Sequence, residues 1–263
     1  VWIMAYTTID DPSAYFQTKI YTGTGSSQAY TFDGNSDMQP DFLWFKQRSE
    51  EREHRLYDSV RGVTKYLEAH QTGAESTDSG ATGLTALGSD GFTVVSANGV
   101  NAGSSRTYVA WGWKAGTSFT NDASGTGIGS IDSAGSFNND SGFSIVSYTG
   151  TGSAGTIKHG LSSVPKMIIA KDRDSGSLSW FVGHASLGFT KRLKLDGDNA
   201  AADNTVWNNT SPTSSVFSVG DSANANTSGN AIIAYCFAEK QGYSKIGSYT
   251  GNGNADGTFV YTG

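Results

Sequence analysis

Short runs of apolar and β-branched residues, bounded by Gly, Asn, Asp or Ser, recur along the whole chain. Examples are residues 42–45, 91–95 and 108–113. Runs of this length that end at turn-forming residues are typical of β-strands. The pattern therefore predicts an all-β protein with many short strands.

A five-residue signature, Tyr-Thr-Gly-x-Gly, occurs three times, at residues 21–25, 148–152 and 249–253. Each copy ends a run with strand character, and glycine accepts positive φ without steric cost, so we expect a tight turn at each copy. The first two copies are followed by matching material, which indicates an internal repeat. Its spacing exceeds the roughly 20–50 residues of solenoid repeats. Tandem β-sandwich domains, lectin-like or jelly-roll-like, suit this spacing.

The two full repeats match most clearly where residues 38–48 align with residues 163–173. Both segments place a proline, Pro40 or Pro165, shortly before a continuous apolar run that ends in Lys-x-Arg. Proline is tolerated at the start of a strand, and a run that is apolar on both faces is typical of a buried central strand. We expect a central sandwich strand at both places.

The domain boundaries follow from the repeats and from local composition. The segments are an extended N-terminal arm (1–14), a first sandwich (15–116), a Gly/Ser/Asn-rich linker with room for one edge strand (117–141), a second sandwich (142–240) and the start of a third repeat (241–263). A single opening strand cannot bury its apolar face alone, so we expect the native polypeptide to continue. Asp10-Asp11-Pro12-Ser13 in the arm is a turn or cap cluster.

Composition narrows the functional class. Only 16% of residues are charged and the net charge is −6, with Lys and Arg scattered, which argues against nucleic-acid binding. No apolar run reaches the roughly 20 residues that span a membrane, and the first residues lack the features of a signal peptide. The one cysteine, Cys236, lies in an apolar run and is expected to be a buried structural thiol.

Several longer motifs resemble the repeat domains of marine bacteriophage virion structural proteins, usually described as tail fibre proteins. The resemblance covers nearly the whole chain and lies in the three signatures and in residues 39–46, 56–62, 89–93, 108–115, 207–210 and 234–239. It implies a lectin-like sandwich in a virion and brings no catalytic residues.

Two groups of residues are candidate binding sites. Asp196, Asp198 and Asp203 have oxygen ligands at calcium-like spacing, although the glutamate that completes an EF-hand loop is absent and a plain turn uses the same residues. Trp180 and Trp207 lie near loops and are candidate exposed platforms for a glycan, whereas Trp44, Trp111 and Trp113 are expected in the core. No other cofactor is indicated.

Other polar groups favour structural roles. Residues 50–54 superficially resemble a zinc-protease helix but lack its two histidines, so a charged hairpin tip is expected. The four histidines, His54, His70, His159 and His184, are far apart in sequence. No nucleophile elbow is present. Arg61 is expected to pair with Asp58 or Asp41 inside the first sandwich.

These patterns together favour a non-enzymatic structural protein of a phage particle, made in the bacterial cytoplasm. A tail fibre or appendage that reaches cell-surface glycans is the first expectation. In that role the N-terminal arm would contact other virion proteins, and a homo-oligomer, taken as a trimer, would multiply weak binding. The alternatives are a capsid head decoration protein and a secreted carbohydrate-binding module.

Overall fold

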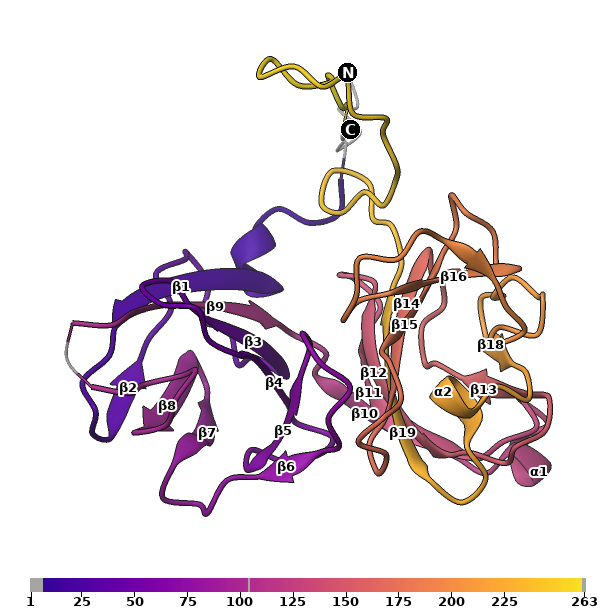
Figure 1. Ribbon diagram of the computed structural model, residues 1–263, viewed down its shortest axis with the longest axis horizontal. Helices are drawn as coiled ribbons and strands as arrows, with labels where there is room; N and C mark the ends of the chain where they lie inside the picture. Colours follow the sequence, from indigo (N-terminus) through magenta and orange to yellow (C-terminus); the bar gives the residue numbers. More distant parts are fainter. Residues whose placement is uncertain (1–6, 104, 262–263) are drawn as a thin grey trace.

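The computed structural model describes residues 7–103 and 105–261, and it is all-β, as the sequence predicts. Two β-sandwiches lie side by side, and the chain enters and leaves them on the same side (Figure 1). Each sandwich consists of one large and one small antiparallel sheet.

The first sandwich has a six-stranded and a three-stranded sheet. The large sheet has the order β1 (Phe16–Thr22), β9 (Thr107–Trp113), β3 (Phe42–Gln47), β4 (His54–Asp58), β5 (Lys65–Glu68) and β6 (Ser76–Thr77). The small sheet has the order β2 (Gln28–Tyr30), β8 (Gly91–Val95) and β7 (Gly83–Gly88). The run that contains residues 42–45 forms β3, which is a central strand, as expected.

The second sandwich repeats the order of the large sheet and extends it by two strands, whereas its small sheet has two strands instead of three. Its large sheet has the order β10 (Thr117–Asn121), β11 (Ser133–Asn138), β12 (Phe143–Thr149), β19 (Ala231–Phe237), β14 (Met167–Asp172), β15 (Phe181–His184), β16 (Lys191–Lys194) and β17 (Ala202–Asp203). Its small sheet pairs β13 (Gly155–Lys158) with β18 (Val216–Val219). The order from β12 to β17 matches the order from β1 to β6, so the internal repeat is one of structure as well as sequence.

The prediction that residues 117–141 form a linker between the sandwiches is wrong. This segment forms β10, a short helix α1 (Ala123–Thr126) and β11, and the two strands extend the second large sheet along the outer edge of β12. Its small residues serve close packing: a Cβ at Gly135 would overlap the carbonyl oxygen of Ile145 on the neighbouring strand. A composition rich in Gly and Ser therefore marks tight contacts here and not a flexible connection.

The two sandwiches are joined by a shared core, so they are not independent domains. Each has its own core between its sheets, and a third cluster lies between the two large sheets. Its buried members come from both sandwiches: Phe42, Leu56, Leu67, Ala69, Ala115, Phe143, Ile145, Ile169, Trp180, Val182, Ile233 and Tyr235. The result is four stacked layers in the order small, large, large, small.

This stacking explains why the central strands are apolar on both faces. In β3, Leu43 and Phe45 point into the core of the first sandwich, whereas Phe42 belongs to the shared core. In β14, Ile168 likewise faces its own core and Ile169 faces the first sandwich. Successive side chains of a strand point to opposite faces, so one apolar run serves two interfaces.

The two chain ends differ from the sandwiches. Before β1, Asp11 caps the 3₁₀ helix η1 (Pro12–Ala14) by accepting a hydrogen bond from Ser13 N–H at 2.9 Å, as the cap cluster predicts. The first six residues of the predicted arm lie outside the described part. After a bridge between Lys240 and Ser244, the chain up to residue 261 contains no strand, so the strand expected over 243–249 is not formed. A strand needs a neighbour for its hydrogen bonds, and no described strand lies beside this segment.

The short helix α2 (Ala223–Asn226) precedes β19 and completes the second sandwich. It holds Asn226, which is fully buried. Its counterpart in the first sandwich is the loop that carries Asn101, also fully buried.

Candidate functional site

The expectation that Trp180 and Trp207 are exposed is wrong, because both side chains are fully buried. Trp180 lies in the shared core and its indole N–H donates to the carbonyl of Glu68 at 3.0 Å, across the two sandwiches. Trp207 packs edge-on against Phe189 in the second core. Neither ring can therefore contact a glycan at the surface. The reason for their burial is the large apolar area of an indole ring, which is stabilised in any core that can cover it.

The three aspartates proposed for calcium make separate contacts within the protein. Asp196 accepts a hydrogen bond from the backbone N–H of Trp180 at 3.0 Å, and Asp203 pairs with Lys191 at 2.8 Å. Asp198 is exposed. Over residues 7–103 and 105–261, no group of three or more His, Cys, Asp or Glu side chains is placed to hold a metal ion.

The structure brings together two of the four histidines, which the sequence separates. The rings of His54 and His70 lie 6.4 Å apart, and Trp44 donates from its indole N–H to His54 Nδ1 at 3.0 Å. Burial and the nearby Lys46 lower the pKa of His54 below its ordinary value. Residues 50–53 lie in the loop between β3 and β4, as the predicted charged hairpin tip requires, whereas His54 is already the first residue of β4.

His159 is a buried structural histidine. Its Nδ1 accepts a hydrogen bond from Leu161 N–H at 3.2 Å, so Nε2 carries the proton and donates to the carbonyl of Thr213 at 3.2 Å. Burial lowers the pKa of His159 to about 4. The ring is therefore neutral near pH 7 and bridges two loops.

Cys236 is the buried thiol that the sequence predicts. Burial raises its pKa to about 12, so the thiolate that would act as a nucleophile is scarce at neutral pH. Lys171 is also buried, and burial lowers its pKa to about 8. Its ammonium donates to the carbonyls of Asp172 and Ser175, which closes the turn after β14.

A network of buried charged groups is centred on Arg61. Of the two partners that the sequence allows, Asp58 and Asp41, Arg61 pairs with Asp58: Nε donates to Oδ2 at 2.5 Å, and both side chains are fully buried. Arg61 also contacts Glu75 at 3.2 Å and the carbonyl of Leu56 at 2.9 Å. Burial lowers the pKa of Arg61, but Asp58 and Glu75 outweigh burial and raise it above its ordinary value.

The sequence does not reveal that this network crosses to the second sandwich. The hydroxyl of Tyr235 on β19 donates to Asp58 Oδ2 at 2.7 Å. Glu75 accepts two hydrogen bonds from Arg173, both at 2.9 Å. Together with the shared core, these bonds fix the orientation of the sandwiches, because buried charged groups tolerate little displacement from their partners.

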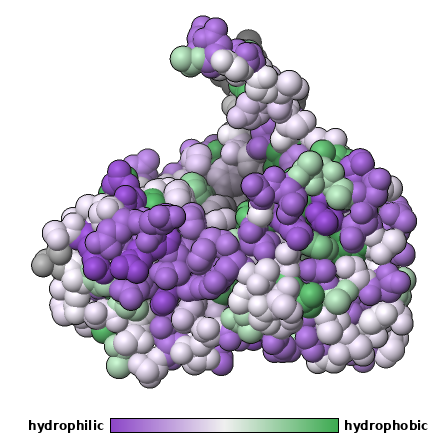
Figure 2. Space-filling view, in the orientation of Figure 1, coloured by the Kyte–Doolittle hydropathy of each residue, from purple (hydrophilic) through white to green (hydrophobic). Residues whose placement is uncertain are grey.

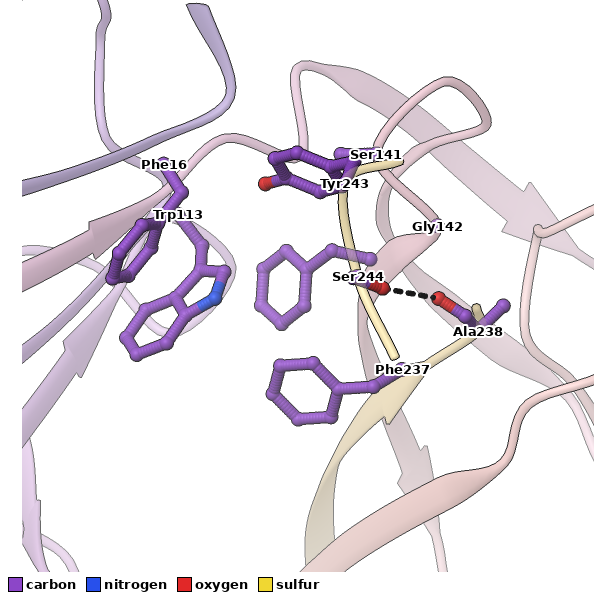
Figure 3. Close-up of a pocket in the computed structure, with 9 residues that line it drawn as sticks. Phe16, Trp113, Ser141, Gly142, Phe237, Ala238, Tyr243 and Ser244 are labelled. Carbon is purple, nitrogen blue, oxygen red and sulfur yellow. Dashed lines mark hydrogen bonds between the residues drawn. The ribbon is translucent and has the colours of Figure 1, made fainter. Parts of the chain in front are cut away.

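A cavity of about 200 Å³ lies at the junction of the two sandwiches and the C-terminal segment. Trp113 of the first sandwich and Phe237 of the second lie on opposite sides, with Tyr243 near its rim (Figure 3). Ser141 also lines it, and the Ser141 hydroxyl has no hydrogen-bond partner among the described residues. Its aromatic walls suit a small apolar group better than a sugar, which needs many hydrogen-bond partners.

The signature residues form a clamp that is the same in both sandwiches. In the first, Tyr21 donates to the carbonyl of Val100 at 2.6 Å, Asn101 Oδ1 accepts from Thr24 N–H at 2.8 Å, and Asn101 Nδ2 donates to Ser26 at 2.7 Å. In the second, Tyr148 bonds to Ala225 at 2.7 Å, and Asn226 holds Thr151 and Ser153 at 2.8 and 2.7 Å. The clamp therefore consists of the signature, which forms the turn, and of the buried asparagine, whose hydrogen bonds hold the turn closed.

The glycines of the signature have two distinct roles. The last glycine of each copy has positive φ, +70° at Gly25, +70° at Gly152 and +67° at Gly253, which supports the predicted tight turns. The first glycine of the signature allows a neighbouring residue to approach its backbone closely in the first two copies. A Cβ at Gly150 would overlap the carbonyl oxygen of Thr227, and one at Gly23 would lie 2.7 Å from the ring of Tyr108.

The outer surface is mainly polar. On the face shown in Figure 2, hydrophilic side chains gather over the first sandwich, and the C-terminal segment projects from the body. The large apolar side chains that are exposed among the described residues are Ile20, Val164, Tyr249, Phe259, Val260 and Tyr261, and four of these six belong to the C-terminal segment. No helix among the described residues is long and apolar enough to cross a membrane.

Comparison with known proteins gives one match. The sequence model of a family described as "Domain of unknown function (DUF7483)" matches residues 11–263. No significant match was found among curated proteins or solved structures.

Proposed function

The chain belongs to the DUF7483 family, and we propose that it is a non-enzymatic structural protein of a bacteriophage particle, an appendage such as a tail fibre. The observation that carries the proposal is the rigid union of two copies of one sandwich through a shared core and a buried ionic network. The motif resemblance to phage virion repeat domains supports the same function.

The shared core supports this function because an appendage has to hold a fixed shape outside the cell. Two sandwiches joined by a flexible linker would move independently, whereas a buried apolar interface gives one stiff unit. The Arg61 network also fixes the orientation of one sandwich relative to the other, since its hydrogen bonds join Asp58 of the first to Tyr235 of the second. The polar surface suits a protein in contact with water on many sides.

One observation favours capsid head decoration as a second candidate. The segments before and after the two sandwiches, residues 7–11 and 245–261, leave them on the same side (Figure 1). A pair of sandwiches connected through one face suits a knob fixed to a shell by that face, and neighbouring virion proteins are then its partners.

The test is to locate the protein in particles of the phage that encodes it. Purified particles are analysed by mass spectrometry and by cryo-electron microscopy, with a host cytoplasmic protein as the contamination control. Density of two joined sandwiches at the tail or its base supports the appendage, and density over the capsid lattice supports decoration. If the protein is no more abundant than the contamination control, the proposal of a virion protein is wrong.

A further inference from the structure

The cavity at the junction of the two sandwiches has walls made mainly of aromatic rings. Phe16 and Trp113 of the first sandwich form one pair, with ring centroids 4.8 Å apart. Phe143 and Phe237 of the second form another pair at 5.1 Å, and Tyr243 lies near the rim (Figure 3). The described residues that complete the lining are Ser141, Gly142, Ala238 and Ser244, so none of the lining side chains is charged. Such a lining favours a neutral ligand with an aromatic ring.

One buried polar group at this cavity lacks a partner. The Ser244 hydroxyl donates to the carbonyl of Ala238 at 3.1 Å, which is the dashed line in Figure 3. The backbone N–H of Gly142 donates to the carbonyl of Asn138 at 3.0 Å, and its carbonyl accepts from Ala238 N–H at 2.7 Å. Ser141 is only 4% exposed, yet its hydroxyl has no hydrogen-bond partner among the described residues. A ligand that supplies this partner is stabilised here, because a buried hydroxyl without a hydrogen bond is unfavourable.

The volume of the cavity suits a small ring better than it suits water. A buried water typically makes about three hydrogen bonds, and aromatic walls do not supply them. Apolar cavities of about 150 Å³ stay dry and bind benzene. This cavity has about 200 Å³, which is room for one six-membered ring with one or two substituents.

We propose that this cavity is a binding site for a neutral small molecule with one aromatic ring and one hydroxyl group, of which a simple phenol is the smallest example. The ring of the ligand packs against the aromatic walls, and its hydroxyl exchanges a hydrogen bond with the Ser141 hydroxyl. A charged ligand is disfavoured because no charged lining side chain compensates for its loss of water. A sugar is disfavoured because it has several hydroxyl groups to satisfy.

Binding in this cavity acts on the joint between the two sandwiches. Its walls come from both of them, so a bound ring adds contacts across the joint. A ligand that binds only the joined arrangement stabilises that arrangement. This inference does not depend on the virion proposal, and it stands or fails by its own experiment.

The experiment titrates the full chain with 4-fluorophenol and, separately, with fluorobenzene, which has the same ring but no hydroxyl. Binding is followed by ¹⁹F NMR of the ligand. We expect saturable binding of 4-fluorophenol with a Kd of about 1 mM, in keeping with its small number of non-hydrogen atoms. Fluorobenzene is expected to bind about fivefold more weakly, because it cannot pair with the Ser141 hydroxyl.

Three variants locate the binding and assign the role of the hydroxyl. Ser141→Ala is expected to weaken 4-fluorophenol about fivefold and to change fluorobenzene by less than about twofold. Ser141→Leu fills the cavity and is expected to abolish binding of both ligands. Ser144→Ala is the matched control, because the Ser144 hydroxyl is also buried without a described partner but does not line the cavity. Thermal unfolding without ligand checks that each variant is folded.

Three outcomes overturn the proposal. The first is the absence of saturable binding of 4-fluorophenol up to about 10 mM, which is tenfold above the expected Kd. The second is equal affinity of the original chain for 4-fluorophenol and fluorobenzene, which would remove the role of the hydroxyl. The third is unchanged binding of 4-fluorophenol by a folded Ser141→Leu chain, which would place the ligand elsewhere on the protein.

Discussion

Replacing Arg61 by alanine tests how the two sandwiches are held together. The side chains of Arg61 and Asp58 are both fully buried, so the substitution leaves a buried carboxylate without its cation. Asp58 would keep only the hydroxyl of Tyr235 and the backbone N–H of residue 61. Breaking a buried ion pair from one side typically costs about 3–5 kcal/mol.

The lost contacts place Arg61 at the upper part of this range. Its guanidinium bonds to Asp58, Glu75, the carbonyl of Leu56 and the hydroxyl of Tyr235, so four acceptors lose a donor at once. We expect Arg61→Ala to lower the free energy of unfolding by about 4 kcal/mol. Domains typically have a stability of about 5–15 kcal/mol, so the variant remains folded but is close to its limit.

The assay is equilibrium urea unfolding followed by tryptophan fluorescence, because Trp180 lies in the shared core and reports on its opening. Arg173→Ala is the matched control. Arg173 bonds to the same Glu75, but its side chain is 19% exposed, so we expect a loss of about 1 kcal/mol. The double variant Asp58→Asn with Arg61→Met removes the buried charge and is expected to recover more than half of the loss.

Two results would refute this reasoning. A loss below about 1 kcal/mol for Arg61→Ala would mean that water replaces the guanidinium beside Asp58 and compensates for its loss. A double variant no more stable than Arg61→Ala would mean that packing, and not the unpaired carboxylate, sets the cost.

Three further predictions concern the clamp, a buried histidine and the two buried tryptophans. Gly150→Ala is expected to lower the free energy of unfolding by about 1–3 kcal/mol because its methyl group overlaps Thr227, whereas Gly251→Ala stays within about 0.5 kcal/mol; urea unfolding of both variants checks this. The pKa of His159 is about 4 in the folded chain, below the ordinary value of 6.5, so stability is fully present above pH 6.5 and is lost as the pH falls towards 4. From pH 7 to pH 5, protonation linked to His159 lowers the free energy of unfolding by about 2 kcal/mol. Urea unfolding at the two pH values should show that this loss is absent in His159→Gln. Trp180→Phe removes the indole donor from the carbonyl of Glu68, whereas the indole N–H of Trp207 has no hydrogen-bond partner among the described residues. Calorimetry is therefore expected to show a cost about 1 kcal/mol higher for Trp180→Phe than for Trp207→Phe, and equal costs would contradict the importance of the inter-sandwich hydrogen bond.

Local features of the fold were predictable because they depend on residues close in sequence. The apolar runs that became β3 and β14 were recognisable from their length and their flanking prolines. The tight turns at Gly25 and Gly152 follow from the freedom of glycine at positive φ. The Asp58–Arg61 pair spans three residues, so it too was within reach of sequence reasoning.

Errors arose where one residue type fits two environments. Glycine and serine are common both in flexible linkers and where backbones pack closely, and the segment with Gly135 is of the second kind. Tryptophan beside a loop is equally suited to an exposed platform and to a core. Trp180 is buried because residues of the first sandwich pack against it in the shared core.

The sequence by itself determined the all-β class, the repeated unit, the turns and the central strands, because periodicity and backbone preference act over a few residues. Only the tertiary structure decided that the two large sheets stack on one another and that a charged network crosses between them. Asp58 and Tyr235 are 177 residues apart, and their hydrogen bond exists only because two folded surfaces meet. No local pattern encodes such a contact, since it depends on the shape of both faces at once.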